Sequence, residues 1–126
     1  MATVTGANIA LRYDALENAK SMFWETLTAT NDRGSGFEWP LGADASVHVF
    51  GDFGSGGAIQ IEGSNTETVP ADDSTDWAVM DDAYGNAMTF TSEELLAIGP
   101  VARWIRPIRS AGSGFDLDVV LLARRR

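Results

Sequence analysis

One stretch of this sequence indicates the fold: Gly51-Asp52-Phe53-Gly54-Ser55-Gly56-Gly57-Ala58-Ile59-Gln60-Ile61-Glu62-Gly63-Ser64-Asn65. Its first glycines are typical of a tight turn, because glycine adopts positive φ angles without a steric cost. Ile59 and Ile61 then alternate with polar residues, and an alternation of period two places both isoleucines on one face of a strand. A second turn follows at Gly63-Ser64-Asn65. We therefore predict a small β-sandwich with both isoleucines in its core.

Short strand signals separated by turn residues continue on both sides of this stretch, at the spacing expected of a sandwich or barrel. Pro107 is expected at a sheet edge, because proline has no N–H for a strand ladder. Residues 13–23 are weakly patterned and are predicted to be irregular, and the polar residues 65–76 are predicted to form a surface loop. The expected strands are 4–11, 24–30, 37–39, 45–50, 58–62, 77–80, 87–90, 101–108 and 115–121, with 77–80 and 87–90 paired as a hairpin.

One segment carries a helix signal. Thr91 is placed to cap a first turn, and Glu94, three residues on, can return a bond to its backbone amide. Gly99-Pro100 then ends the helix, whose apolar residues Leu95, Leu96 and Ile98 would close one end of the core. The chain is therefore predicted to be all-β, a small antiparallel β-sandwich or jelly-roll-like barrel with one short helix near residues 92–98.

Length and composition fit one folded domain. The chain has 126 residues, of which 44% are hydrophobic and 21% charged, an ordinary globular composition. We expect an N-terminal arm or edge strand over residues 1–12 and a single β-sandwich over residues 13–126. Neither a membrane span nor a secretory leader is expected from the apolar pattern. Without cysteine the domain has no disulfide to stabilise it, so oligomerisation is a candidate source of stability.

Charge is divided unevenly along the sequence. Residues 1–100 hold 3 basic and 16 acidic side chains, a net charge of −13, whereas residues 101–126 hold 6 basic and 2 acidic ones, a net charge of +4. An acidic body disfavours nucleic acid as a partner, because phosphate binding depends on positive charge. Two interpretations of the basic end stay open: a contact surface for an acidic partner or sister subunit, or solvated charges that keep the domain soluble. The basic residues concerned are Arg103, Arg106, Arg109 and Arg124 to Arg126.

Catalytic and metal-binding motifs are sparse. His48 is the only histidine and stands beside no nucleophile motif, so a structural role is favoured over a catalytic one. The glycines of residues 51–57 lack the Gly-Lys-Ser/Thr ending of a phosphate-binding loop. Five aspartates lack the spacing of a calcium loop, namely Asp72, Asp73, Asp76, Asp81 and Asp82. We predict no catalytic residues, no metal site and no cofactor.

Four tryptophans make sugar binding an alternative interpretation of the sequence. Aromatic faces beside aspartates suit a sugar-binding surface, where rings stack on the sugar and carboxylates bind its hydroxyl groups. The other interpretation places most tryptophans in the core or at subunit contacts, where large aromatic surfaces contribute most. The residues are Trp24, Trp39, Trp77 and Trp104.

Four segments carry a family resemblance: Phe53-Gly54-Ser55-Gly56-Gly57-Ala58-Ile59-Gln60-Ile61-Glu62-Gly63-Ser64-Asn65, then Trp77, then Tyr84-Gly85-Asn86-Ala87-Met88-Thr89-Phe90-Thr91, and Trp104-Ile105-Arg106-Pro107. Over roughly residues 45–123, the chain resembles small virion structural proteins of tailed bacteriophages, of the capsid decoration or cement type. The resemblance implies a non-enzymatic protein that is made in the host cytoplasm, binds the major capsid protein on the outer surface of the head shell and stabilises the shell. It also implies a homo-oligomer, with a trimer favoured.

Two contact regions are predicted for such a protein, with neither nucleic acid nor a membrane as partner. An N-terminal arm would pair with the edge strand of a neighbour. The strand of the basic end would contact the shell or another subunit. The predicted contact residues are Thr3, Val4, Thr5, Ile9, Leu11, Arg103, Trp104 and Arg106. The alternative from a different class is a tail- or head-associated carbohydrate-binding module for host attachment, whose binding would depend on Trp39 or Trp77.

Overall fold

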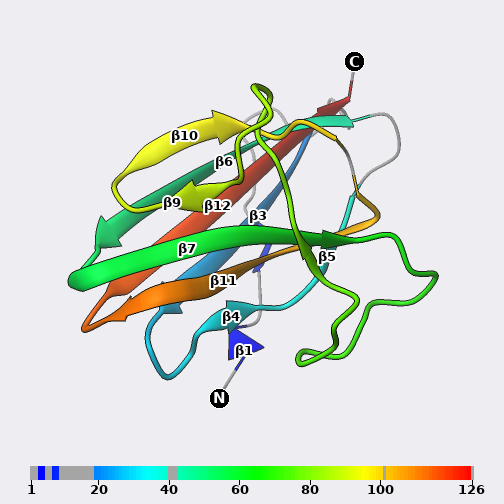
Figure 1. Cartoon of the computed structure of the whole chain (residues 1–126). Coiled ribbons are helices and arrows are strands. Elements are labelled where there is room, and N and C mark those ends of the chain that lie inside the picture. The colour runs from blue at the N-terminus through cyan, green and yellow to red at the C-terminus, as the bar shows by residue number, and fades with distance from the viewer. Residues whose placement is uncertain (1–2, 5–6, 9–18, 40–42, 101, 126) are drawn as a thin grey trace.

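A computed structural model of the chain describes residues 3–4, 7–8, 19–39, 43–100 and 102–125, and two facing β-sheets make up its architecture (Figure 1). In the seven-stranded sheet the order is β1-β4-β11-β7-β8, with β5 also paired to β11 and β9 to β7. Its strands are β1 (Thr3–Val4), β4 (Arg33–Gly34), β5 (Phe37–Glu38), β7 (Ser55–Ser64), β8 (Ala78–Val79), β9 (Thr89–Phe90) and β11 (Trp104–Ser113).

The five-stranded sheet has the order β10-β6-β12-β3-β2. Its strands are β10 (Glu94–Ala97), β6 (Ala43–Asp52), β12 (Asp116–Arg125), β3 (Ala19–Leu27) and β2 (Ala7–Asn8). Nearly all pairs are antiparallel, the exception being β1 with β4. The predicted all-β sandwich is confirmed at this level. None of the described segments is a helix long and apolar enough to cross a membrane.

The core lies between the two sheets, as the alternating patterns predict. Ile59 and Ile61 on β7 are 0% and 1% exposed, which confirms their predicted place. Inward side chains of β6 and β12 face them. On β6 these are Val47 and Val49, on β12 the central one is Val119, and all three are fully buried. Further members of the core come from both sheets and from the segments that join them: Trp24, Leu27, Phe37, Met80, Met88, Phe90, Ile105, Phe115, Leu117 and Leu121.

The glycine-rich turn between β6 and β7 meets the turn between β11 and β12 at one end of the sandwich (Figure 1). Gly54 has a φ of 57°, and a Cβ there would lie 2.5 Å from the carbonyl carbon of Gly114. The carboxylate of Asp52 accepts a bond from the Gly54 amide at 2.8 Å and closes the turn. Glycine is therefore required at this turn by both backbone conformation and the close approach of a second backbone.

The predicted helix at residues 92–98 is wrong: Glu94–Ala97 is strand β10, paired antiparallel with β6. A helix of two turns is marginal in water, whereas the edge of β6 offers partners for the backbone of the whole segment. Leu96 lies opposite Val47 and packs on the core, while Leu95 points outward and is 66% exposed. The apolar residues of this segment therefore alternate as a strand.

Pro107 lies inside the sheet, not at the expected edge. β11 has β7 on one side and β4 and β5 on the other. Ile61, the partner of Pro107 on β7, has both backbone groups bonded to Met80 and Met88 on its other side. The N side of Pro107 thus faces away from β7, towards the gap between the end of β4 and the start of β5, where no ladder bond is needed. A gap between two short strands therefore accommodates the proline.

Two further strand predictions are corrected in detail. β8 and β9 both pair with β7, so the predicted hairpin of 77–80 with 87–90 is limited to the isolated bridge of Asp81 with Ala87 and the bond from the Met88 amide to the Met80 carbonyl. β3 begins at Ala19, so residues 19–23, predicted irregular, are strand. Residues 13–18 lie outside the described residues.

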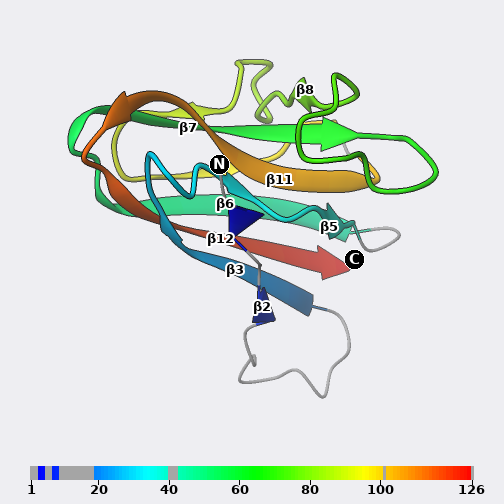
Figure 2. The same ribbon diagram turned by 90° about the horizontal axis from the view of Figure 1, so that it is seen from below.

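The N-terminal segment belongs to both sheets of its own chain. Thr3–Val4 pairs with β4 in the seven-stranded sheet, and Ala7–Asn8 pairs with β3 in the five-stranded sheet. Both are short strands at the edges of their sheets (Figure 2), and the other residues of the predicted arm, 1–2, 5–6 and 9–12, lie outside the described residues.

Candidate functional site

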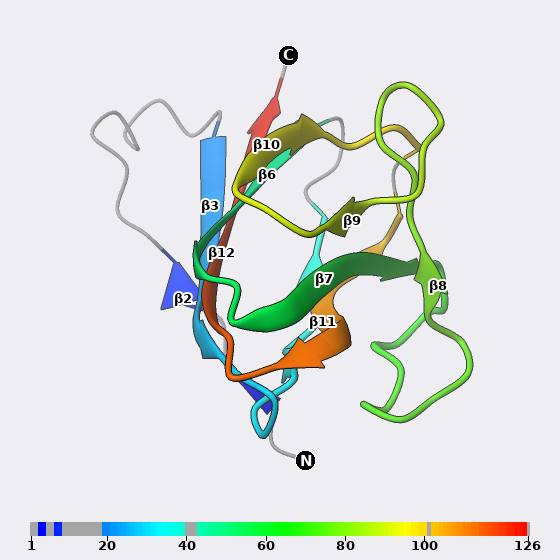
Figure 3. The same ribbon diagram turned by 60° about the vertical axis from the view of Figure 1, so that its left-hand side comes forward.

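Residues 65–77, here called the anchored loop, connect β7 to β8 on the side of the seven-stranded sheet that faces away from the core (Figure 3). The prediction of a surface loop without strands is confirmed for residues 65–76. The loop does not extend freely into solvent, however. Hydrogen bonds from strands β7 and β11, from β4 and from β1 hold it at its start, middle and end.

The middle of the loop is held by two buried arginines. Nη1 of Arg33 and Nη1 of Arg106 both donate to the carbonyl oxygen of Asp72, at 2.6 and 2.7 Å. Arg33 and Arg106 are 8% and 3% exposed. The Thr3 hydroxyl on β1 donates to the Asp72 carboxylate. One loop residue is thus bound by three strands that are far apart in sequence.

Arg106 is the most heavily engaged of these side chains. It is the register partner of Glu62, so both side chains emerge on the same face of the sheet. Nε and Nη2 of Arg106 donate to Oε1 of Glu62 at 3.0 and 2.9 Å. Its guanidinium carbon also lies 4.3 Å from the ring centroid of Trp77, a cation–π contact. The indole N–H of Trp77 donates to the Ala71 carbonyl at 3.1 Å, which fixes the end of the loop to its middle.

The start of the loop is held by the beginning of β11. The indole N–H of Trp104 donates to the Thr66 carbonyl at 3.0 Å, and the Arg103 amide donates to the side-chain oxygen of Asn65 at 2.9 Å. Gly36 lets the loop approach β5, since a Cβ there would lie 2.7 Å from Cγ2 of Val69. The loop is therefore bonded to the sheet at its start as well as at its middle.

The structure places the predicted contact residues around this loop. Thr3 and Val4 form β1, and Arg103, Trp104 and Arg106 come from β11 and the residue before it. Arg103 is exposed and pairs with Glu38 at 3.5 Å, whereas Arg106 is buried under the loop and offers no surface in this conformation. The remaining predicted residues, Thr5, Ile9 and Leu11, lie outside the described residues.

Sequence reasoning missed four of the residues that hold the loop, Arg33, Glu62, Asp72 and Trp77. The arginines of residues 101–126 were interpreted as surface charges. Three of them have partners within the chain: Arg103 with Glu38, Arg106 with Glu62, and Arg109, whose Nε donates to the Gly112 carbonyl at 3.1 Å. The sequence did indicate that Trp104 and Arg106 act on the same side of the sheet, because they are two residues apart and so share one face of a strand.

The outward surface of the anchored loop is acidic with one exposed large apolar side chain. Val69 is 46% exposed. Around it the exposed charged residues are all acidic: Glu67, Asp72, Asp73 and Asp76. Such a surface suits a basic partner, and its fixed backbone lowers the entropy lost when the partner binds.

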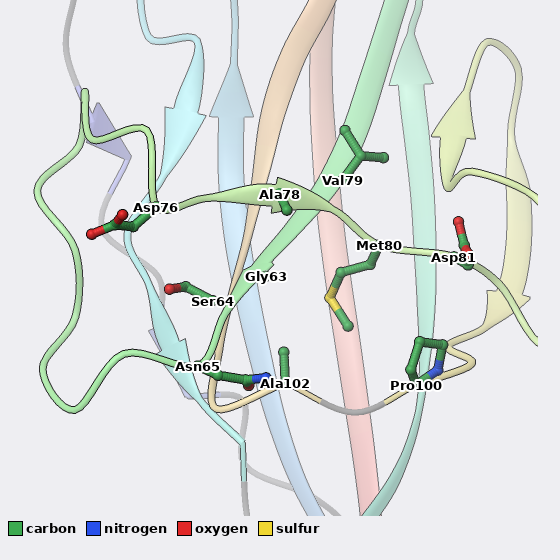
Figure 4. Close-up of a pocket in the computed structure, with 10 residues that line it drawn as sticks. All are labelled: Gly63, Ser64, Asn65, Asp76, Ala78, Val79, Met80, Asp81, Pro100 and Ala102. Carbon is green, nitrogen blue, oxygen red and sulfur yellow. The ribbon is translucent and has the colours of Figure 1, made fainter.

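A depression of about 340 Å³ adjoins the end of the loop (Figure 4). It lies between β8 and the segment that leads into β11, with Met80 and Gly63 at its base and the carboxylates of Asp76 and Asp81 at its two sides. None of the four tryptophans lines it. Its lining is completed by Ser64, Asn65, Ala78, Val79, Pro100 and Ala102.

The aspartates weighed for calcium have separate roles. The buried carboxylate of Asp82 accepts bonds from the amides of Tyr84 and Asn86 at 2.8 and 3.0 Å, and so closes the turn between β8 and β9. In the part of the chain that the structure describes, no three His, Cys, Asp or Glu side chains come together as a group able to hold a metal ion. His48 lies on the other sheet, where its Nε2 is 2.9 Å from Glu93.

Comparison of the chain with protein-family models, with curated proteins and with solved structures finds no match.

Proposed function

We propose that this chain is a non-enzymatic capsid decoration protein that binds the outer surface of a bacteriophage head shell, through contacts with the major capsid protein, and stabilises the shell. The proposal rests on the resemblance of residues 45–123 to such virion proteins and on the form of the anchored loop. A decoration protein needs a rigid surface that docks many times on a repeated lattice, so that individually weak contacts add up.

The observation that carries the proposal is the fixation of the anchored loop by buried charge. Arg33 and Arg106 converge on one carbonyl oxygen of the loop, and each guanidinium has a carboxylate partner in the chain, Asp32 and Glu62. Because an unpaired buried charge is costly, loss of either partner of such a pair would be destabilising, and the bonds from both guanidinium groups tie the loop backbone to these pairs. What the loop displays is an acidic surface around Val69. We infer that this surface, together with exposed Arg103 and half-buried Trp104, contacts the shell.

The experiment is a binding assay with heads of the phage that encodes the chain, prepared without it. The wild-type protein should bind the expanded heads at a stoichiometry set by the lattice. Asp73→Lys reverses a charge on the anchored loop and should weaken binding. The matched control is Asp116→Lys, which makes the same charge change on an exposed residue of β12. Absence of lattice binding by the wild-type protein, or equal effects of the two variants, would contradict the proposal.

The N-terminal arm enters this proposal in a modified form. Thr3–Val4 pairs with β4 of its own chain, so pairing with a neighbouring subunit would require the arm to leave β4 and exchange between copies. Deletion of residues 2–11 tests the exchange: if the deleted protein binds heads with the wild-type stoichiometry and affinity, the arm has no part in the contact. We keep a homo-oligomer, with a trimer favoured, as part of the proposal.

The placement of the tryptophans favours decoration over the carbohydrate-binding alternative. Trp24 and Trp77 are buried, and the indole N–H groups of Trp24, Trp77 and Trp104 donate to backbone carbonyls. Trp39 is half-buried and packs against the core. Specific binding of a cell-surface glycan by the purified chain, lost in Trp39→Ala with the fold retained, is the result that would restore the alternative.

A further inference from the structure

The outer face of the five-stranded sheet is apolar at its centre. Near the middle of β6, β12, β3 and β10 several outward positions hold half-buried or exposed apolar and aromatic side chains, whereas the outward positions towards the strand ends are mostly charged. In a sandwich the outward positions are usually polar. In the described part of the chain, no strand or loop outside this sheet lies over that face (Figures 2 and 3). We call it the five-strand face; its central side chains are Phe23, His48, Phe50, Leu95, Val120 and Leu122.

The central strand of this sheet presents a symmetrical pattern on the five-strand face. β12 points Asp118, Val120, Leu122 and Arg124 outward, since Leu117, Val119, Leu121 and Ala123 are buried on the opposite side. The outward order along β12 is therefore acidic, apolar, apolar, basic. If a second copy of β12 lies across it in the opposite direction, Asp118 meets Arg124, and Val120 meets Leu122.

We propose that two copies of this chain pack through their five-strand faces about a two-fold axis, an arrangement that would replace the trimer favoured by the family resemblance. The axis lies between the two sheets, perpendicular to the strands, and passes between Val120 and Leu122. Sheets that pack face to face lie about 10 Å apart, a spacing filled by one layer of side chains from each sheet. A two-fold interface brings the same surface of both copies together, so the surface must complement itself.

The neighbouring strands have the complementarity that this axis requires. Val120 lies in register with His48, which lies in register with Leu95 on β10, and together they form a row of larger side chains. Leu122 lies in register with Ser46, which lies in register with Ala97. The axis places the first row of one copy on the second row of the other. His48 then meets Ser46, and Leu95 meets Ala97, so that in these two central rows large side chains face small ones. In the next rows outward, Phe50 meets Asp44, because they lie in register with Asp118 and Arg124.

Charge complementarity identifies the occupant as a second copy. Each two-fold pair would contain two contacts between Asp118 and Arg124, one on each side of the axis. Oδ1 of Asp118 accepts a bond from the Thr26 amide at 2.9 Å, and the carboxylate retains lone pairs for a guanidinium. Asp118 and Arg124 are six residues apart on one strand, which corresponds to about 20 Å. They are thus too far apart to pair within one chain.

Charge reversal tests the pairing. We would measure the dimer dissociation constant of the full chain by sedimentation equilibrium. Asp118→Arg or Arg124→Asp places like charges together twice in the dimer, and each should raise the dissociation constant about tenfold or more. The double variant Asp118→Arg/Arg124→Asp restores opposite charges and should restore most of the affinity. At a separation of about 20 Å, beyond the Debye length of about 8 Å at physiological salt, such rescue cannot arise within one copy.

Charge reversal at Asp118 also removes its bond to the Thr26 amide. A second pair of variants therefore tests the interface without changing Asp118. Val120→Asp places a carboxylate at the centre of the interface and should leave a folded monomer. Val79→Asp makes the same change on β8, in the other sheet, and should leave the dimer intact. A wild-type chain that stays monomeric at every concentration, a double reversal without rescue, or equal effects of the two valine variants would overturn the proposal. Because no step uses the shell, its failure would leave the proposed decoration function untouched.

Discussion

The outer face of the seven-stranded sheet carries charged side chains and is covered, whereas the five-strand face is apolar and no described segment covers it. On the first, Arg106 and Glu62 lie beneath the anchored loop, and Arg106 contacts the ring of Trp77 at the end of that loop. On the second, Leu95 is 66% exposed beside His48. The polarity of an outward strand residue therefore does not decide its exposure. Its exposure depends on whether another part of the chain lies on that face.

The two faces also use their ion pairs differently. The Arg106–Glu62 pair has side chains that are 3% and 16% exposed, and it is joined by a cation–π contact and a bond to the loop backbone. The His48–Glu93 pair has side chains that are 38% and 66% exposed. A buried pair must keep both partners, because an unpaired buried charge is costly, while a solvated pair contributes little. Substitutions on the two faces should therefore differ in effect.

The largest effect is expected for Arg106→Ala. It leaves Glu62 without its partner, removes one of the two guanidinium bonds to the Asp72 carbonyl and takes away the cation–π contact of Trp77, so the free energy of unfolding should fall by about 3–5 kcal/mol. Urea unfolding followed by tryptophan fluorescence measures the change. Arg109→Ala, an exposed arginine on the same strand, is the control and should stay within about 0.5 kcal/mol of the wild type. A loss below about 1 kcal/mol in Arg106→Ala would mean that the loop is not held by this residue.

A matched change of carboxylate to amide compares the faces directly. Glu62→Gln removes the charge that Arg106 binds and should lower the free energy of unfolding by about 1.5–3 kcal/mol. Glu93→Gln removes the charge beside His48 and should lower it by about 0.5 kcal/mol or less. Both variants are measured in the same urea titration. Similar losses at the two sites would refute the difference between a covered and an uncovered face.

A smaller effect is expected at the start of the anchored loop. Trp104→Phe keeps an aromatic ring but removes the N–H that donates to Thr66, so about 1 kcal/mol should be lost. Limited proteolysis reports the local consequence, since a loosened loop should be cut faster between Asn65 and Trp77. Unchanged cleavage kinetics would show that the Trp104–Thr66 bond is not needed to hold the start of the loop.

The smallest effect is expected from Thr3→Val, which removes the hydroxyl that binds the Asp72 carboxylate while keeping the shape of the side chain. The expected loss is about 0.5 kcal/mol, the low end for a hydrogen bond near solvent. Comparison of the variant with Thr28→Val, which removes the hydroxyl bonded to the Asn31 amide elsewhere on the surface, isolates the contribution of β1 to the loop. Equal rates of cleavage of the loop in the two variants would show that β1 does not help to hold the loop.

The fold follows largely from local patterns in the sequence. Ile59 and Ile61 on β7, and Phe115, Leu117, Val119 and Leu121 near the end of the chain, alternate with polar or outward residues, and period two is a property of each strand alone. The helix predicted at residues 92–98 failed because the capping signal at Thr91 is local, while the pairing of β10 with β6 joins residues that are distant in sequence. Long-range pairing overrides a weak local preference.

The candidate sites could not be predicted in the same way. Arg33 and Arg106 meet at Asp72, and these three residues lie on separate segments that only the folded sheet brings together. On β12 the alternation of Leu117, Val119 and Leu121 predicts the inward residues, yet Val120 and Leu122 on the outward side of the same strand are also apolar. A strand that is apolar on both faces indicates contact on both faces.

The most direct test compares one reporter on each face in a single NMR experiment. His48 is the only histidine, so its imidazole signals report on the five-strand face without overlap, and the indole N–H of Trp104 reports on the start of the anchored loop. When the protein is diluted in a concentration series, we expect the His48 signals to shift along the monomer–dimer curve while the Trp104 signal stays constant. A shift of Trp104 with a constant His48, or no shift of either signal as the dimer dissociates, would contradict it.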